Sequence, residues 1–493
     1  MRTLPHPLQG MLEALPPRRR DAFAADLATR ARDLGLVYLG AQGRRPIPVA
    51  FPPVIELREA TRRRSRITHG ITAALAGVAW RILDGALGSS LADDLLAELA
   101  PVERRIVEAG HRRVERLATV RADLVADPRG VEHVLELNAT IPAMQGYSDI
   151  AARAFVEAAL ALHGRDADPS AILEANGSNA DDLLRSLVAC YRAEGGAADR
   201  PSIALVHRRE DSQLGELEFL AARFRGHGHD ARTVIADDVR PDAGTARVGD
   251  FAPDVLYRHV FVTKVDPASP FAAILERPEG HHLFNPVDPH LEQKAMLAEL
   301  SAASVDEVRA RALGVSPVEA ALVRARVPWT RRLRPGAATD REGARIPELV
   351  AHLQERQASW VIKRSWDFGG KGVFLGAEYG DERSRQRAAA RFGAELSWGA
   401  LVEACASEPG WIVQERVPLQ ARPLHFASAD GARPASAFVD VSAYANLGAD
   451  DAQPTGGVCR ASSSAIVNIQ SGGGVVPLLS AEAADRLVEA LRG

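Results

Sequence analysis

The sequence is poor in cysteine. Its 493 residues include three cysteines, Cys190, Cys405 and Cys459. These lie far apart and follow no metal-ligand spacing, which excludes a disulfide framework and a structural zinc motif. We therefore expect a reducing, cytoplasmic environment and assign the three thiols to the core.

Long apolar runs and an excess of one charge are also lacking. The longest apolar stretch runs from Gly70 to Trp80, well short of the roughly 20 residues that cross a bilayer. The opening segment MRTLPHPLQGMLEALPP holds four prolines, so we expect no export signal. The net charge is -4, which provides no basic field for nucleic acid. We expect neither a membrane nor a nucleic-acid partner; the oligomeric state is not indicated.

Lysine is rare among the basic residues. Of 60 basic residues, four are lysine and 56 are arginine. A retained lysine therefore needs a physical reason, and the ammonium group offers one because this compact charge enters narrow phosphate sites that exclude a planar guanidinium. For Lys264, chance retention is an equally good explanation.

Apolar residues make up 46% and charged residues 25% of the chain, which suits a globular protein with a large core. At roughly 150 residues per domain, the length predicts about three domains or one multi-lobed enzyme. The helix and strand patterns predict a mixed α/β and α+β fold. The expected ranges are a helical N-terminal region (1–115), a β-hairpin with a following helix (116–165), a helical connector (166–200), a Rossmann-like α/β domain without a dinucleotide motif (201–290), a helical linker (291–345), an α+β lid (346–418) and a strand-rich end (419–493).

A lysine on a strand precedes a glycine-rich turn. Lys363 ends the apolar run WVIK, and Gly369, Gly370 and Lys371 follow shortly after. Glycine lets backbone N–H groups approach phosphate oxygens closely, so this segment predicts a phosphate cradle. It is not a Walker A loop, because Gly372 stands where Ser or Thr is needed. The alternative is a hairpin turn with an incidental lysine.

Acidic and amide side chains recur on an expected hairpin. Asp123 lies on one extended run, and Glu136 and Asn138 lie two residues apart on the next. Alternation along a strand puts Glu136 and Asn138 on one face. Two carboxylates and an amide oxygen form the hard oxygen site that Mg²⁺ uses beside nucleotide phosphates. The alternative is a half-buried hairpin with exposed polar residues.

Two further segments are weaker signals. Gln414 and Glu415 end an apolar strand before Pro418, where a hinge could offer backbone groups to an adenine ring. Lys294 lies on an expected helix, nine positions after Asn285 in the FNPVDP turn; taken alone, this segment is a turn with a surface lysine. The arginine-rich runs at 18–20 and 62–66 are interpreted as solvated surface.

Together these motifs resemble the ATP-grasp superfamily, and more closely its branch of glutathionylspermidine synthetase and related circularly permuted proteins. The branch has an Arg-x-Asp strand and a Glu-x-Asn strand, matched here by Arg121, Asp123, Glu136 and Asn138. The resemblance spans about residues 115–480 and includes the runs DVLYRHVF, FNPVDPHLEQK, VIK, VQERV, GGVCR and VNIQSGGG. The segment MQGYSDI departs from the family pattern, and no amidase domain is present.

The resemblance implies a role for each matching residue. Asp123, Glu136 and Asn138 would bind Mg²⁺, and Arg121 and Arg460 would stabilise the transferring phosphoryl group. The nucleotide and substrate contacts would come from Lys294, Lys363, Gly369, Gly370, Lys371, Gln414, Glu415, Asn468, Gly472 and Gly473.

The implied fold is a permuted ATP-grasp with a Rossmann-like pre-ATP-grasp domain, in which the hairpin at 119–142 joins the same sheet as Arg460. The implied reaction is ATP-dependent amide or peptide ligation through an acyl phosphate, releasing ADP and phosphate. Its substrates would be a small-molecule or peptide carboxylate and an amine, neither identified by the sequence. A small-molecule kinase and a nucleotide-binding protein without turnover are the alternatives.

Overall fold

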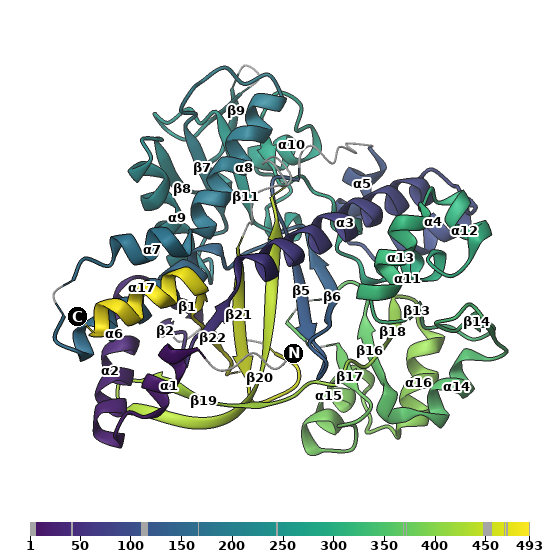
Figure 1. The fold of residues 1–493 in the computed structure, drawn as a ribbon. Helices are drawn as coiled ribbons and strands as arrows, with labels where there is room; N and C mark the ends of the chain where they lie inside the picture. The colour runs from purple at the N-terminus through teal and green to yellow at the C-terminus, as the bar shows by residue number, and fades with distance from the viewer. Residues whose placement is uncertain are drawn as a thin grey trace.

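The structure is a computed structural model, and it describes residues 6–40, 43–109, 117–165, 167–242, 245–367, 369–370, 372–446, 456–467, 469 and 472–492. Three larger sheets with packed helices make up this part of the chain (Figure 1). Within it, no helix combines the length and the apolar character needed to cross a membrane.

A seven-stranded sheet forms the centre of the molecule, with its strands in the order β19-β3-β22-β21-β20-β5-β6. The long strand β20 pairs with β5 on one side and with β21 on the other. This arrangement confirms the prediction that the hairpin at 119–142 and Arg460 share a sheet. The strands are β3 (Val49–Phe51), β5 (Val120–Ala126), β6 (Glu132–Asn138), β19 (Arg422–Ser428), β20 (Gly431–Ala445), β21 (Gly457–Ser462) and β22 (Gly474–Val476).

The N-terminal region is not wholly helical, contrary to the prediction for 1–115. It contains β1 (Val37–Gly40), β2 (Gly43–Pro46) and β4 (Val54–Glu56) as well as β3. Strand β3 is antiparallel to β19 and parallel to β22, and β4 pairs with β23 (Leu478–Ser480). Strands β1 and β2 pair with each other, whereas the three-residue runs β3 and β4 become strands by pairing with segments over 370 residues away, so local periodicity does not reveal them.

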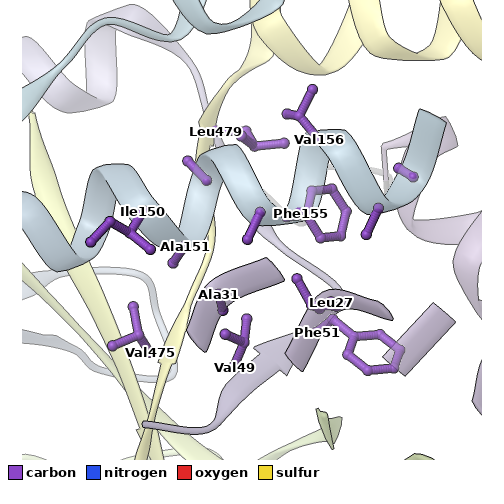
Figure 2. Packing of buried hydrophobic residues seen from close by; sticks show 14 of the residues in the cluster. Leu27, Ala31, Val49, Phe51, Ile150, Ala151, Phe155, Val156, Val475 and Leu479 are labelled. Atoms are coloured by element: carbon purple, nitrogen blue, oxygen red, sulfur yellow. The ribbon is translucent and has the colours of Figure 1, made fainter. Parts of the chain in front are cut away.

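Two apolar clusters cover the central sheet. One joins α2 (Pro17–Asp33), α6 (Gln145–Leu162) and α17 (Ala481–Arg492) to β3, β21 and β22, and Figure 2 shows Phe51 and Phe155 within it. The other joins α3 (Arg58–Leu83) and α11 (Lys294–Ala303) to β5 and β6. Tyr444 and Ala443, neighbours on β20, belong to different clusters, as alternation along a strand requires.

A four-stranded parallel sheet, in the order β12-β11-β7-β8, lies in the range 201–290 for which the sequence predicted a Rossmann-like domain. Its helices α8 and α9 pack on apolar residues of β7 and β11. The expected alternation of strand and helix from residue 201 is confirmed. The elements are α8 (Asn179–Ala193), β7 (Ile203–His207), α9 (Leu214–Gly226), β8 (Ala231–Ile235), β11 (Val255–His259), α10 (Pro270–Glu276) and β12 (Leu283–Phe284).

A four-stranded antiparallel sheet, in the order β13-β18-β16-β17, lies mostly in the range 346–418 that the sequence predicted to be a lid, and we call it the lid sheet. Four tryptophans, among them Trp360 and Trp411, pack with α14 and α16 in one cluster. Strand β13 comes from the range expected to be a helical linker. The elements are β13 (Thr330–Arg332), α14 (Leu349–Glu355), β16 (Trp360–Arg364), β17 (Val373–Leu375), α15 (Glu382–Phe392), α16 (Trp398–Ser407) and β18 (Trp411–Glu415).

The remaining elements are short. They are α1 (Pro7–Glu13), α4 (Ser89–Leu96), α5 (Pro101–Glu108), α7 (Ser170–Asn176), β9 (Arg240–Asp242), β10 (Thr245–Arg247), α12 (Glu307–Ala312), α13 (Pro317–Arg326), β14 (Ala338–Thr339) and β15 (Arg345–Ile346). The three cysteines are buried, in agreement with their assignment to the core.

Candidate active site

A cleft of about 370 Å³ lies between the central sheet and the lid sheet. It collects eleven of the fifteen residues predicted from the sequence, although they come from segments up to 339 positions apart. Lys371 and Asn468 lie outside the described residues. Gly472 is exposed, Gly473 is buried, and neither lines the cleft. The eleven that line it are Arg121, Asp123, Glu136, Asn138, Lys294, Lys363, Gly369, Gly370, Gln414, Glu415 and Arg460.

The hairpin of β5 and β6 presents the acidic and amide residues to the cleft. In its register, Asp123 is opposite Glu136 and Arg121 is opposite Asn138. All four side chains reach the cleft, which agrees with the expected placement of Glu136 and Asn138 on one face.

Asn285 holds the two ends of this hairpin together. Its Nδ2 atom donates to the carbonyl oxygens of Thr119 and Ala139, each at 2.7 Å. The Thr119 N–H donates to the Asn285 Oδ1 atom at 3.3 Å. Asn285 is fully buried, so these bonds fix where the hairpin begins and ends relative to the Rossmann-like domain.

Arg121 and Arg460 flank Asp123 from two sides. Arg121 Nε donates to Asp123 Oδ1 at 2.8 Å, and Arg460 Nη2 donates to Oδ2 at 2.9 Å. Ser442 Oγ also donates to Oδ1, at 3.0 Å. Burial alone would raise the pKa of Asp123, but the two guanidinium charges and their hydrogen bonds lower it. The carboxylate therefore remains ionised at neutral pH.

Asp440 is a member of the site that the sequence reasoning missed. It is opposite Arg460 on the neighbouring strand and accepts hydrogen bonds from the Arg460 backbone N–H at 3.1 Å and from Nε at 3.1 and 3.2 Å. Burial raises the pKa of this carboxyl group, and the Arg460 charge acts against that rise. The alternation of Asp440, Ser442 and Tyr444 on one strand was the signal that could have found it.

The two cleft lysines have different partners. Lys363 Nζ donates to Gln414 Oε1 at 2.8 Å on the adjacent strand of the lid sheet. Lys294 Nζ lies 3.2 Å from Glu136 Oε2, and this ion pair joins α11 to the hairpin. The N-terminus of α11 also binds the lid, because the Lys294 N–H donates to the Ser365 carbonyl at 3.0 Å.

Burial changes how these groups titrate. It lowers the pKa of Lys363 to about 8, a shift that the negative charge of Glu136 opposes. For Glu136, burial acts to raise the pKa, but the Lys294 charge brings it below its usual range. Lys363 is therefore a cation that loses its proton within reach of physiological pH.

Gln414 and Glu415 have local partners that the sequence did not predict. Besides accepting from Lys363, the Gln414 side chain donates to Thr330 Oγ1 at 3.1 Å and to the Leu135 carbonyl at 3.3 Å. Glu415 pairs with Arg341 at 2.8 Å, near the surface. The Gln414 side chain thus positions Lys363, and a contact to adenine at this hinge stays a prediction.

The chemistry of the hairpin fits a magnesium ion. Among the described residues, no group of three or more His, Cys, Asp or Glu side chains is placed to hold a metal. The site instead offers two carboxylates, Asp123 and Glu136, and the amide of Asn138. Mg²⁺ is usually bound by one or two carboxylates, waters and substrate phosphates, so this donor set fits an ion that arrives with a nucleotide.

Glu292 is a second residue that the sequence reasoning missed. This buried carboxylate lines the cleft and accepts from the backbone N–H groups of Ala139 and Thr140 at 3.1 and 2.8 Å. Burial raises its pKa. It fixes the segment directly after Asn138, and it precedes Lys294 by two residues.

The comparison with solved structures bears on the fold. A glutathione synthetase-like effector from Globodera pallida, solved in its apo form, matches with a TM-score of 0.56 over 94% of this chain and 98% of that chain. The identity is 12%, so the likeness concerns the fold alone. No family model and no curated protein sequence matches the chain.

Replacing Lys363 by alanine should weaken ATP binding by roughly 10- to 150-fold, because a charge-assisted phosphate contact is worth about 1.5–3 kcal/mol. Lys363→Arg should also weaken it, since a planar guanidinium does not reproduce the compact charge that Lys363 Nζ places beside Gln414. Calorimetric titration with ATP and Mg²⁺ measures both. Lys264→Ala, at an exposed lysine, is the matched control. An unchanged dissociation constant in folded Lys363→Ala would contradict the assignment.

ATP affinity should fall as the pH rises through about 8. Lys363 is protonated below its pKa of about 8 and neutral above it, and only the ammonium form attracts phosphate. A bound phosphate raises that pKa, so the dissociation constant should increase by up to about tenfold per pH unit above 8. Titrations from about pH 7.5 to 9.5, above the phosphate pKa of about 6, test this. Lys363→Met should be flat over the same interval.

Proposed function

We propose that this protein is an ATP-dependent carboxylate–amine ligase that forms an amide or peptide bond through an acyl phosphate and releases ADP and phosphate. One observation carries the proposal. The cleft brings the phosphate-binding candidates Lys294 and Lys363 together with the hairpin carboxylates and Arg460, at the junction of the two sheets. These are the charges that phosphoryl transfer needs, and the arrangement requires no side-chain nucleophile.

The residues divide the work between them. Lys294 and Lys363 would bind nucleotide phosphates, with Gly369 and Gly370 of the adjoining turn, whose φ values are 71° and 73°, allowing close approach of the backbone. Asp123, Glu136 and Asn138 would hold Mg²⁺, which supplies charge neutralisation between the phosphate oxygens. Asp123 is bound by Arg121 and Arg460 in this structure, so metal binding would compete with the two arginines.

Asp440 keeps Arg460 in place during that exchange. Arg460 has two carboxylate partners, and its bonds to Asp440 do not involve Asp123. Arg460 would therefore stay aligned beside the reacting groups even without its bond to Asp123, and it would stabilise the charge that develops on the phosphoryl group.

The covalent steps need only ATP, the acid and the amine. A carboxylate oxygen attacks the γ-phosphorus, and the bond from that phosphorus to the bridging oxygen breaks with its electron pair leaving on ADP. The amine nitrogen then attacks the acyl carbon, and phosphate leaves with the pair of the broken C–O bond. The amine proton passes to solvent.

The proposal includes a circularly permuted ATP-grasp core related to glutathionylspermidine synthetase. In it, the strands of 116–165 and of 419–493 would be two halves of one core, 346–418 its lid and 201–290 the pre-ATP-grasp domain. The shared sheet of β5, β20 and β21 supports this arrangement. The likeness in fold to the glutathione synthetase-like effector of Globodera pallida also supports the proposal of ligase chemistry.

The test is ADP release with pooled carboxylates and pooled amines, in the presence of ATP and Mg²⁺. A ligase needs both pools and yields a product whose mass is the sum of acid and amine less one water. A kinase would give a product heavier by one phosphoryl group, and a protein without turnover would bind ATP and release no ADP. The Lys363→Ala variant is the blank, and removal of Mg²⁺ by EDTA should stop turnover.

A further inference from the structure

One wall of the cleft is apolar and carries no charge. It consists of Tyr38, Ile47, Ile141, Met144 and Tyr147, which all line the cleft. They belong to, or pack against, one hydrophobic cluster of the core. We call these five residues the apolar wall.

The backbone around the apolar wall is held in place from behind. Glu216 is buried and accepts from the N–H groups of Met144 at 2.6 Å and Gly146 at 3.2 Å. Tyr147 Oη donates to the Val37 carbonyl at 2.6 Å, which joins α6 to β1. Met144 has a φ of 88°, a left-handed conformation that these contacts maintain. The backbone of the wall is therefore fixed, and its half-buried members Tyr38 and Ile141 present most of its surface to the cleft.

The apolar wall adjoins the catalytic arginines. Arg121 Nη1 donates to the Ala143 carbonyl at 2.9 Å, and Ala143 directly precedes Met144. A carboxylate beside Arg121 and Arg460 would therefore place the rest of its molecule against this wall.

The carboxylates that line the cleft beside the central sheet already have partners. Asp123 and Asp440 bind Arg460, Glu136 binds Lys294, and Glu292 accepts two backbone N–H groups. A polycation such as a polyamine would have to break these pairs to gain an anchor. A second carboxylate on the acid would lie mostly against apolar side chains, where Tyr38 and Gln213 are the polar groups nearby, so it would regain little of the hydration that it loses.

We propose, on the basis of the proposed ligase function, that the acid substrate is a monocarboxylic acid with a compact apolar or aromatic body that binds the apolar wall. We expect a compact body because the nucleotide would lie in the same cleft. Pockets of this kind combine an apolar lining with a few polar groups that orient the ligand.

The test uses matched acids with hydroxylamine in place of the amine, so that any acyl phosphate is trapped as a hydroxamate. Hexanoate is compared with adipate, and phenylacetate with 4-carboxyphenylacetate, each pair differing by one carboxylate. We expect kcat/KM at least tenfold higher for the monoacid of each pair. Ile141→Ala, which shortens the half-buried side chain of the wall, should raise the KM for phenylacetate about tenfold and leave the KM for ATP unchanged.

Leu419→Ala is the matched control, because Leu419 is a half-buried apolar residue of the same cleft outside the apolar wall. It should leave the KM for phenylacetate unchanged. Equal or better turnover of the diacids would overturn the apolar substrate class and leave the ligase function standing.

A binding measurement separates the two proposals. If no acid gives ADP or hydroxamate, saturation-transfer NMR with phenylacetate decides between the remaining outcomes. Binding that Ile141→Ala weakens would support the apolar site and refute the ligase. Absence of both binding and turnover would overturn both proposals.

Discussion

Replacing Arg460 by alanine should lower turnover by about 100- to 1,000-fold while changing the ATP dissociation constant by less than about threefold. Removing a preorganised donor that faces developing charge has effects of this size. The guanidinium lies between Asp123 and Asp440 and lines the cleft, so its charge matters most when the phosphoryl group is in transit. Steady-state kinetics with the acid found in the substrate screen, together with calorimetry for ATP, separates the two effects.

Two further variants distinguish an effect on catalysis from a loss of folded protein. Arg460→Ala leaves Asp440 buried without its main partner, so Arg460→Ala combined with Asp440→Asn removes the unpaired charge and restores stability without restoring turnover. Asp440→Asn alone keeps a polar partner for Arg460 and should lower kcat with little change in KM. A parallel loss of ATP affinity and turnover in folded Arg460→Ala would contradict the assigned role.

Replacing Arg64 by alanine should lower the free energy of unfolding by about 3–5 kcal/mol, the cost of leaving buried charges unpaired. The sequence interpretation of 62–66 as solvated surface is wrong at this residue, which is 4% exposed. Arg64 Nη1 donates to Glu56 Oε2 at 2.9 Å, and Nε donates to Glu132 Oε1 at 3.0 Å. It thereby joins α3 to β4 and to the start of β6.

Urea unfolding of Arg64→Ala and of Arg62→Ala provides the measurement and its matched control. Arg62 is exposed on the same helix, so its loss should change stability by less than about 0.5 kcal/mol. Because Glu132 begins the strand that carries Glu136, Arg64→Ala should also weaken ATP binding. Equal stability of the two variants would show that the buried network contributes nothing.

The sequence alone determined the local features of this protein. Alternation put Glu136 and Asn138 on one face, since side chains two residues apart on a strand share a face. The hairpin register then places Asp123 opposite Glu136. The scarcity of lysine singled out Lys294 and Lys363, both in the cleft, while the exposed Lys264 lies outside it. The Rossmann-like domain followed from its alternating strands and helices.

The tertiary structure decided which distant residues meet. Strand β3 joins the central sheet because β19 and β22 pair with it. Its three residues are too few to show the periodicity from which a strand could be predicted. The partners Arg460 and Asp123 are 337 residues apart in the sequence. Lys363 and Gln414 meet because their strands, β16 and β18, are neighbours in the lid sheet. Local patterns specify the face on which a side chain lies, whereas ion pairs and burial depend on the element packed opposite. For that reason Asp440, Glu292 and the buried Arg64 emerged only once the sheets and helices were assembled.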